Sequence, residues 1–256
     1  LSIGTAGCNF RCGFCQNYLI AHGNPPASYF SPENMLQLTI MSTKDKSIGL
    51  AFTYNEPGIW FEYIMDVARL LKEHNCKVVL VTNGFIEEKP LNELLPLVDA
   101  MNIDVKAFTD DFYRRCCKGR LGPVQRCVEM VAGKLHVEVT NLVVPGQNDS
   151  PDEIETLARW LASINPKTPL HLSRYHPAYK FTLDATDPEV INRNREIARQ
   201  HLKFVYTGNI IGDENTTLCL NCGAVLIRRN YYRTVLEAWE NGVCKSCGAL
   251  IDYIKY

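Results

Sequence analysis

Cys8-Asn9-Phe10-Arg11-Cys12-Gly13-Phe14-Cys15 is the stretch that decides the fold, and it directly follows a short apolar run at the start of the chain. Its cysteines have the spacing Cys-x3-Cys-x2-Cys, which supplies three thiolates and not four. A four-iron cluster is bound by cysteine sulfur, and a site with three protein ligands leaves one iron free to bind another molecule. The spacing therefore predicts an open iron-sulfur site. The alternatives are a zinc knuckle completed by His22 and cysteines that pack as small apolar side chains.

The composition limits the classes of function. A length of 256 residues is enough for one large domain or two smaller ones, and 46% hydrophobic residues is typical of globular proteins. The net charge of -1 predicts neither a nucleic-acid partner nor a solvating acidic tail. No run reaches the roughly 18 to 20 apolar residues that span a bilayer, and no signal-type segment opens the chain, so we expect no membrane partner.

The cysteine content indicates a cellular compartment. The chain has eleven cysteines, most of them in metal-type spacings; this favours a reducing environment, and we expect a cytoplasmic protein. The chain opens at Leu1, already inside an expected strand, which favours a further segment ahead of it.

Short apolar runs alternate with helical stretches over residues 1–215. The runs that we expect to be strands are residues 1–6, 48–54, 76–82, 100–106, 135–144, 170–175 and 203–207. Several are nearly continuous in Val, Ile and Leu, as in parallel strands buried on both faces. Helices are indicated by the apolar spacing of residues 62–72 and by a capping box at Ser150-Pro151-Asp152-Glu153. We therefore expect an α/β fold, a partial barrel of about six β/α units with its sites at the carboxyl ends of the strands.

Residues 216–256 show a different pattern. Two Cys-x2-Cys pairs, Cys219/Cys222 and Cys244/Cys247, are each followed by glycine and flank expected hairpin strands at 225–227 and 231–236. Four thiolates in this spacing predict a zinc-ribbon-like module, because zinc is the common structural occupant and glycine allows the backbone to turn around the metal. A rubredoxin-type iron or a second cluster would use the same ligands.

Polar residues stand at the ends of the expected strands. Asn55 and Glu56 follow the second strand, where Glu56 would either contact a ligand or simply begin a helix favourably. Asp104 and Lys106 interrupt an apolar run, which is costly unless the two charges pair or serve a ligand. His176 follows the sixth strand, where it is either a solvated surface histidine or a ligand contact.

The cysteine run, with aromatic Phe14 before its last cysteine, resembles the signature of the radical S-adenosylmethionine (SAM) enzymes. Asn55-Glu56-Pro57 resembles the turn that receives the methionine amino group of SAM in that family, and Asp104-Val105-Lys106 resembles a motif of the glycyl-radical-activating enzymes. Further stretches that match, over nearly the whole chain, the AmmeMemoRadiSam system radical SAM enzymes are Ser2-Ile3-Gly4-Thr5, Val81-Thr82-Asn83-Gly84-Phe85, Val144-Pro145-Gly146, Tyr175-His176-Pro177 and the terminal ribbon.

The resemblance implies a set of roles. Cys8, Cys12 and Cys15 would ligate a 4Fe-4S cluster, with SAM on its open iron. The residues that it would place against SAM are Phe14, near the adenine, and Asn55, Glu56, Asp104, Lys106, His176 and Asn209. It also implies a reducing partner such as flavodoxin or ferredoxin, and an association with AMMECR1-like and Memo-like proteins.

The sequence thus predicts a radical SAM enzyme that acts on a protein glycine or on a small molecule. The alternative is a non-catalytic iron-sulfur or zinc protein that carries electrons or binds a partner, which accounts for the cysteines but not for the charged residues at the strand ends.

Overall fold

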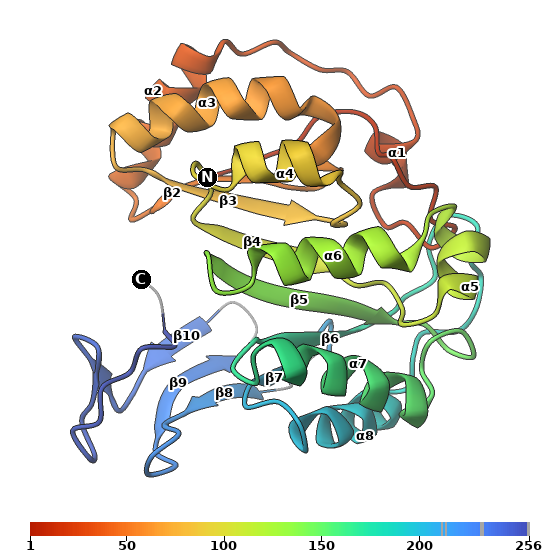
Figure 1. The fold of residues 1–256 in the computed structure, drawn as a ribbon, viewed down its shortest axis with the longest axis vertical. Coiled ribbons are helices and arrows are strands. Elements are labelled where there is room, and N and C mark those ends of the chain that lie inside the picture. The colour runs from red at the N-terminus through yellow and green to blue at the C-terminus, as the bar shows by residue number, and fades with distance from the viewer. Residues whose placement is uncertain (211, 213, 231–232, 255–256) are drawn as a thin grey trace. The chain divides into compact units, whose positions relative to one another are not determined.

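The computed structural model describes residues 1–256 except 211, 213, 231–232 and 255–256. Seven strands form one sheet in sequential order; the first five strands pair in parallel, and so do the last two (Figure 1). They are β1 (Ser2–Ile3), β2 (Gly49–Phe52), β3 (Lys77–Thr82), β4 (Ala100–Asp104), β5 (His136–Val143), β6 (Leu170–Arg174) and β7 (Val205–Gly208). The predicted α/β fold is confirmed. Among the described residues β1 and β7 are the outer strands in this order.

The chain divides into two compact units. The first comprises Leu1–Thr140 and Pro177–Asp184, and the second comprises Asn141–His176 and Ala185–Tyr256. The boundary predicted between residues 215 and 216 stays a prediction.

Helices of the first unit alternate with its strands. They are α1 (Tyr18–Ala21), α2 (Pro32–Thr43), the 3-10 turn η1 (Pro57–Trp60), α3 (Phe61–Glu73), α4 (Glu88–Leu94), α5 (Asp110–Phe112), the π-helical turn η2 (Tyr113–Cys117) and α6 (Leu121–Val131). The predicted helix over 62–72 is α3, whose buried face, including Ile64 and Leu71, packs toward α2 and β3 (Figure 1). The apolar stripe of α3 and the apolar strands thus form one core.

A carboxylate just before β4 joins two elements at the amino ends of the strands. Asp99 Oδ2 accepts from the amide of Val78 at 2.9 Å, and Oδ1 accepts from Lys72 and Lys77 at 3.2 Å each. Burial alone would raise the pKa of Asp99, but these donors outweigh it and lower the pKa.

The second unit contains α7 (Pro151–Ile164) and α8 (Pro188–Arg199), which pack against each other (Figure 1). Ser150 caps α7 by accepting from the amide of Glu153 at 3.3 Å, and Pro151 occupies the first turn, as predicted. The remaining strands are β8 (Glu214–Leu218), β9 (Val225–Asn230), β10 (Arg233–Leu236), β11 (Trp239–Glu240) and β12 (Val243–Cys244). Within the described residues, no helix combines the length and the apolar character that crossing a bilayer requires.

Candidate functional site

The cysteine loop, which we define as residues 4–17, leaves β1 and is fixed by backbone hydrogen bonds within the first unit. The amides of Arg11 and Gly13 donate to the last two carbonyls of η2, at 2.8 and 3.0 Å. The carbonyl of Gly13 accepts from the amide of Lys180 at 2.9 Å. The loop is therefore held between η2 and the segment 177–184.

Aromatic side chains fix the same loop from within. Phe10 is buried against Phe85 and Tyr113, with ring centroids 5.0 and 5.9 Å away. Gly119 leaves room for this ring, because a Cβ atom at that position would lie 2.3 Å from Phe10 Cε1. This contact anchors the chain between the first two cysteines.

Phe14 anchors the chain before the last cysteine. It is buried between Phe112 and Phe181, with centroids 5.7 and 5.6 Å away. A Cβ atom on Gly13 would lie 2.6 Å from the Phe181 ring, so glycine permits this close packing. A contact of Phe14 with the adenine of SAM stays a prediction.

The loop presents three sulfurs in different environments. Cys8 Sγ accepts from the amide of Phe10 at 3.4 Å. Burial raises the pKa of the Cys8 thiol to about 11 and also raises the pKa of Cys15. A side-chain hydrogen bond with Cys117 lowers the pKa of Cys12, which is buried. Because metal ligation needs thiolates, loading a metal centre here must release protons from Cys8 and Cys15.

This donor set fits an iron-sulfur cluster better than a single zinc ion. Within the described part of the chain, His22 and the three loop cysteines do not form a group whose ligand atoms lie within 4.8 Å of one another. A cluster is wider than one ion and is bound by thiolates alone. The loop thus offers the three sulfurs that a 4Fe-4S cluster takes, and the zinc knuckle with His22 is not supported.

Asn55, at the end of β2, fastens the start of the cysteine loop. Its Oδ1 accepts from the amide of Thr5 at 3.0 Å, and its Nδ2 donates to the carbonyl of Gly7 at 2.9 Å. Both polar groups of the side chain therefore position backbone of the loop, and a contact of Asn55 with SAM stays a prediction.

Glu56 is buried and ties β2 to the end of β3. Its Oε1 accepts from the amide of Gly58 at 2.8 Å and from Thr82 Oγ1 at 2.7 Å, and its Oε2 accepts from the amide of Asn83 at 2.8 Å. Burial raises the pKa of Glu56, and the three donors counter part of that effect. The first contact makes Glu56 the cap of η1, which is the helix-start role that the sequence also allowed. Whether Glu56 also contacts SAM stays a prediction.

Asp104 and Lys106 form an ion pair near the cysteine loop. Lys106 Nζ donates to Asp104 Oδ2 at 2.6 Å, and both side chains are largely buried. Burial would lower the pKa of Lys106, but Asp104 and the neighbouring Cys12 sulfur outweigh it and raise the pKa, so Lys106 stays a cation. The expected strand over 100–106 ends earlier, because the amide of Val105 turns back to Ile103 O at 3.1 Å.

Asn83 is a site residue to which the sequence analysis gave no role. Its Nδ2 donates to Asn9 Oδ1 at 2.7 Å and lies 3.7 Å from Cys8 Sγ. Its Oδ1 accepts from the amide of Phe85 at 2.8 Å, and Asn9 Nδ2 donates to Phe85 O at 2.8 Å. The sequence feature that could have indicated this role is the polar Thr82-Asn83-Gly84 turn at the end of a strand. In the structure this turn supports Cys8.

Comparison with known proteins assigns this site to a family. The model of the radical SAM superfamily matches residues 2–161, which include the cysteine loop and the ends of β2, β3 and β4. The chain belongs to the radical SAM superfamily. The radical SAM region of the chain therefore contains every predicted site residue of the first unit.

The chain is also similar to individual proteins. The chain is 39% identical to the uncharacterized protein MJ0808 of Methanocaldococcus jannaschii, over 99% of this chain and 78% of that protein. It is 27% identical to the pyruvate formate-lyase-activating enzyme of Clostridium pasteurianum, over 66% of this chain and 72% of that enzyme. The solved structure of Streptococcus suis SuiB bound to S-adenosylmethionine matches the radical SAM fold with a TM-score of 0.65 at 13% identity, over 82% of this chain and 50% of that chain.

Two predicted residues lie in the second unit. His176 is exposed and directly precedes Pro177. Asn209 has a left-handed backbone, with φ of 61°, and its Nδ2 donates to the carbonyl of Arg174 at 3.2 Å. Their roles toward SAM in this radical SAM protein stay predictions.

The C-terminal cysteines come together as a second metal-type site. The sulfurs of Cys219, Cys222, Cys244 and Cys247 all lie within 4.8 Å of one another. A hydrogen bond from Asn221 Nδ2, at 3.4 Å, lowers the pKa of Cys247 to about 6. A thiolate at neutral pH is the form that binds metal, so the four sulfurs suit one tetrahedral ion.

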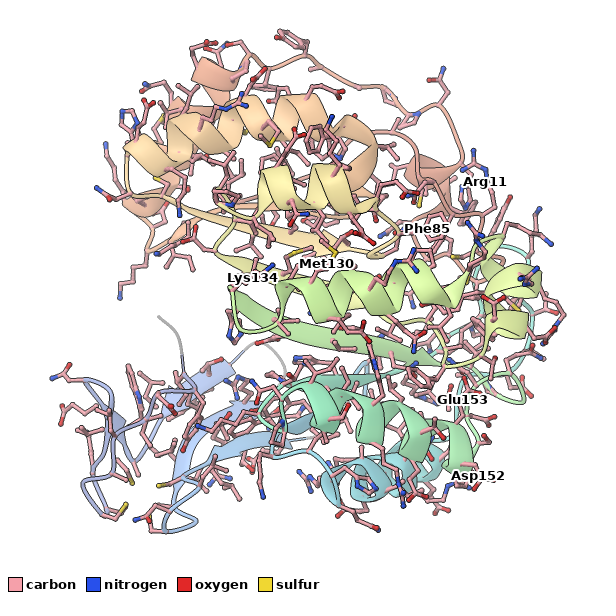
Figure 2. The ribbon with its side chains drawn as sticks, viewed as in Figure 1. Arg11, Phe85, Met130, Lys134, Asp152 and Glu153 are labelled. Atoms are coloured by element: carbon pink, nitrogen blue, oxygen red, sulfur yellow. The ribbon has the colours of Figure 1, made fainter. Side chains whose placement is uncertain are left out.

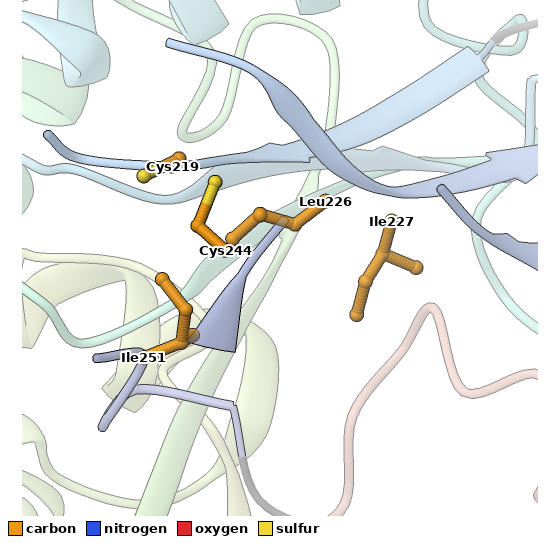
Figure 3. Packing of buried hydrophobic residues seen from close by; sticks show 5 residues of the cluster. All are labelled: Cys219, Leu226, Ile227, Cys244 and Ile251. Carbon is orange, nitrogen blue, oxygen red and sulfur yellow. The ribbon is translucent and has the colours of Figure 1, made fainter. Parts of the chain in front are cut away.

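The backbone around these sulfurs repeats itself. The amides of Gly223 and Gly248 each donate to the carbonyl of the first cysteine of their pair, at 2.8 Å, and both glycines have positive φ angles of 75° and 71°. Cys219 and Cys244 are buried with Leu226, Ile227 and Ile251 (Figure 3). The metal-type site therefore sits on a small core of its own.

The expected hairpin is present as β9 and β10, which pair antiparallel. Residues 231–232, part of the strand expected over 231–236, lie outside the described residues. The sequence missed β8, which pairs with β9 on the other side.

Proposed function

We propose that this protein is an enzyme that cleaves SAM reductively at a 4Fe-4S cluster held by Cys8, Cys12 and Cys15. The observation that carries this proposal is the cysteine loop itself, whose three sulfurs come from one rigid, aromatic-anchored segment beside the Asp104–Lys106 pair. When bound, a reduced cluster supplies one electron to the sulfonium of SAM, which gives methionine and a 5'-deoxyadenosyl radical.

The chain's own residues would bind and orient these groups. Asn55 and Asn83 hold the loop, while Glu56 fixes the turns that follow β2 and β3. Asp104 and Lys106 present a carboxylate and an ammonium to the polar end of SAM. Phe14 would contact the adenine of SAM, and the contacts of His176 and Asn209 with SAM, which the resemblance implies, stay predictions.

The cleavage test uses anaerobically reconstituted protein with SAM and dithionite, followed by chromatography. We expect 5'-deoxyadenosine and methionine in equal amounts. Metal analysis of the same sample distinguishes the rival function, because zinc without iron or sulfide after reconstitution would support a non-catalytic binding protein.

The substrate that meets the radical belongs to one of two classes. Similarity to a pyruvate formate-lyase-activating enzyme supports a protein glycine, from which the radical would take one hydrogen atom to give 5'-deoxyadenosine and a glycyl radical. A small molecule is the other class. Electron paramagnetic resonance of mixtures with candidate partners, such as the AMMECR1-like and Memo-like proteins, separates them, because only the first class leaves a radical on a polypeptide.

We propose zinc as the ion of the four C-terminal cysteines, since a closed set of four thiolates is typical of structural zinc. Elemental analysis after anaerobic purification should find about one zinc per chain.

A further inference from the structure

Exposed basic side chains lie on the cysteine loop and on the two stretches that hydrogen-bond to it. We call these side chains the basic rim; they are exposed, and they are Arg11, Arg114, Arg115, Lys118, Arg120 and Lys180. They come from three stretches of sequence, the cysteine loop itself, residues 110–120 and residues 177–184. The whole chain has a net charge of only -1, so this local excess of cations is not a property of the overall composition.

Backbone contacts bring the three stretches together. Arg11 donates its amide to the carbonyl of Cys117, which directly precedes Lys118. Lys180 donates its amide to the carbonyl of Gly13, one residue beyond Cys12. Arg11 Nη1 lies 3.5 Å from His22 Nδ1, and the ring of Tyr179, which directly precedes Lys180, lies 5.5 Å from the His22 ring, so both stretches meet at His22.

Only part of the positive charge is neutralised within the rim. Arg114 and Arg115 pair with Asp110 and Asp111 at 2.6 Å each. In the part of the chain that the structure describes, the other four rim cations have no carboxylate oxygen within 4 Å. The three stretches contain one further carboxylate, Asp184, so the rim keeps a positive excess.

We propose that the basic rim is the docking surface for an acidic one-electron carrier protein. This inference rests on the proposed function, in which the centre held by the cysteine loop must receive one electron before SAM is cleaved. The reduced carrier loses that electron, the centre gains it, and no proton or bond changes partner. A carrier docked on the rim would lie close to the centre that it reduces. Arg11 is adjacent in sequence to Cys12, and Lys118 directly follows Cys117, whose side chain hydrogen-bonds to the Cys12 sulfur.

Charge complementarity decides the kind of partner. Electron-transfer complexes are small and short-lived, and they rely on opposite charges to speed up encounter and to orient the two redox centres. A positive surface beside the electron-accepting site favours a carrier that is acidic around its own redox group. An acidic substrate protein or a nucleic acid would use the same charges without delivering an electron, so the experiment measures electron transfer and not binding.

The test measures the rate at which photoreduced flavodoxin, an acidic carrier, reduces the reconstituted holoenzyme in an anaerobic stopped-flow instrument. The test variant is Lys118→Glu/Lys180→Glu, and the matched control is Lys134→Glu. Figure 2 shows Arg11 and Lys134 at opposite ends of α6, so the control changes the same type of charge far from the rim. The cationic methyl viologen radical serves as a second reductant.

We expect the double variant to be reduced by flavodoxin about tenfold or more slowly than the wild type at low ionic strength. This difference should fade as salt is raised, because the Debye length falls from about 30 Å at 0.01 M to about 3 Å at 1 M. The control should stay within about twofold of the wild type, since its charge lies outside the docking surface. Methyl viologen should reduce all three proteins equally fast, or the double variant faster.

Several results would overturn the proposal. They are equal losses in the double variant and the control, flavodoxin rates that do not depend on salt, no reduction of the wild type by flavodoxin, and an equal slowing with methyl viologen. Failure of the proposed function looks different. In that case the wild type accepts electrons from both reductants but forms no 5'-deoxyadenosine from SAM.

Discussion

Thr82, at the end of β3, gives the sharpest test of how the site is built. Its buried hydroxyl donates to Glu56 Oε1 at 2.7 Å and accepts from the amide of Gly84 at 3.1 Å. Thr82→Val keeps the shape of the side chain but removes both hydrogen bonds. Glu56 then loses one of its three donors, and the amide of Gly84 loses its acceptor inside the protein.

The cost follows from these two losses. A buried hydrogen-bonding group left without its partner costs about 1–3 kcal/mol, so we expect Thr82→Val to lose about 3 kcal/mol of the free energy of unfolding. Thr82→Ser keeps the hydroxyl and loses one methyl group, which costs about 1 kcal/mol. With a urea dependence of about 2 kcal/mol per molar, the difference of about 2 kcal/mol separates the two midpoints by about 1 M.

The assay is equilibrium urea unfolding under anaerobic conditions, followed by tryptophan fluorescence. The chain has three tryptophans, and replacing Trp160 and Trp239 by Phe leaves Trp60, which packs against Phe52 of β2 at the start of α3, as the reporter of the first unit. Iron content should also fall in Thr82→Val but not in Thr82→Ser, because the neighbouring Asn83 supports Cys8. Equal midpoints for the two variants would refute this reasoning.

Three further predictions follow from other contacts. Asn83→Ala removes the amide near Cys8 Sγ, so the reduction potential of the cluster should fall by about 40 mV, which corresponds to a hydrogen bond of about 1 kcal/mol, in a redox titration followed by electron paramagnetic resonance. Asp99→Asn should cost about 1–2 kcal/mol at pH 7 in urea unfolding. The folded pKa of Asp99 is lowered, so its stabilisation is fully present above the unfolded pKa of about 4 and is lost as the pH falls through the lower, folded pKa. The difference between variant and wild type should therefore shrink as the solution is acidified. Cys222→Ser should remove the ion of the C-terminal module while the iron content stays unchanged.

For each of these three predictions, a specific result would contradict it. An unchanged potential in Asn83→Ala would show that its amide does not act on the cluster sulfur. A stability difference for Asp99→Asn that does not shrink between about pH 5 and about pH 3 would show that the carboxylate charge is not the cause. Loss of iron together with zinc in Cys222→Ser would show that the two metal sites are not independent.

The sequence predicted the strands of the sheet well, because nearly continuous apolar runs have few alternatives in a chain of this size. The ends of those strands were predicted less well. Lys106 lies beyond β4, because a tight backbone turn at Val105 ends the strand. The residue types in this stretch do not predict that turn. The polar strand β8 has no apolar run, and it forms because β9 offers it hydrogen bonds.

The spacing of the cysteines predicted the chemistry of the site, but it did not predict which side chains hydrogen-bond to those cysteines. The contact of Cys117 with Cys12 joins residues more than one hundred positions apart, and only the folded chain brings η2 to the cysteine loop. Asn83 likewise reads as an ordinary turn residue until the structure places its amide near Cys8. Long-range hydrogen bonds of this kind leave no local pattern in a single sequence.

Anaerobic incubation of the reconstituted protein with SAM and dithionite tests the central claim most directly. The wild type should form 5'-deoxyadenosine and methionine in equal amounts, and Cys12→Ala should form neither, because that variant lacks one of the three thiolates that hold the cluster. A Cys12→Ala protein that cleaved SAM as fast as the wild type would contradict the assignment of the cysteine loop as the active centre.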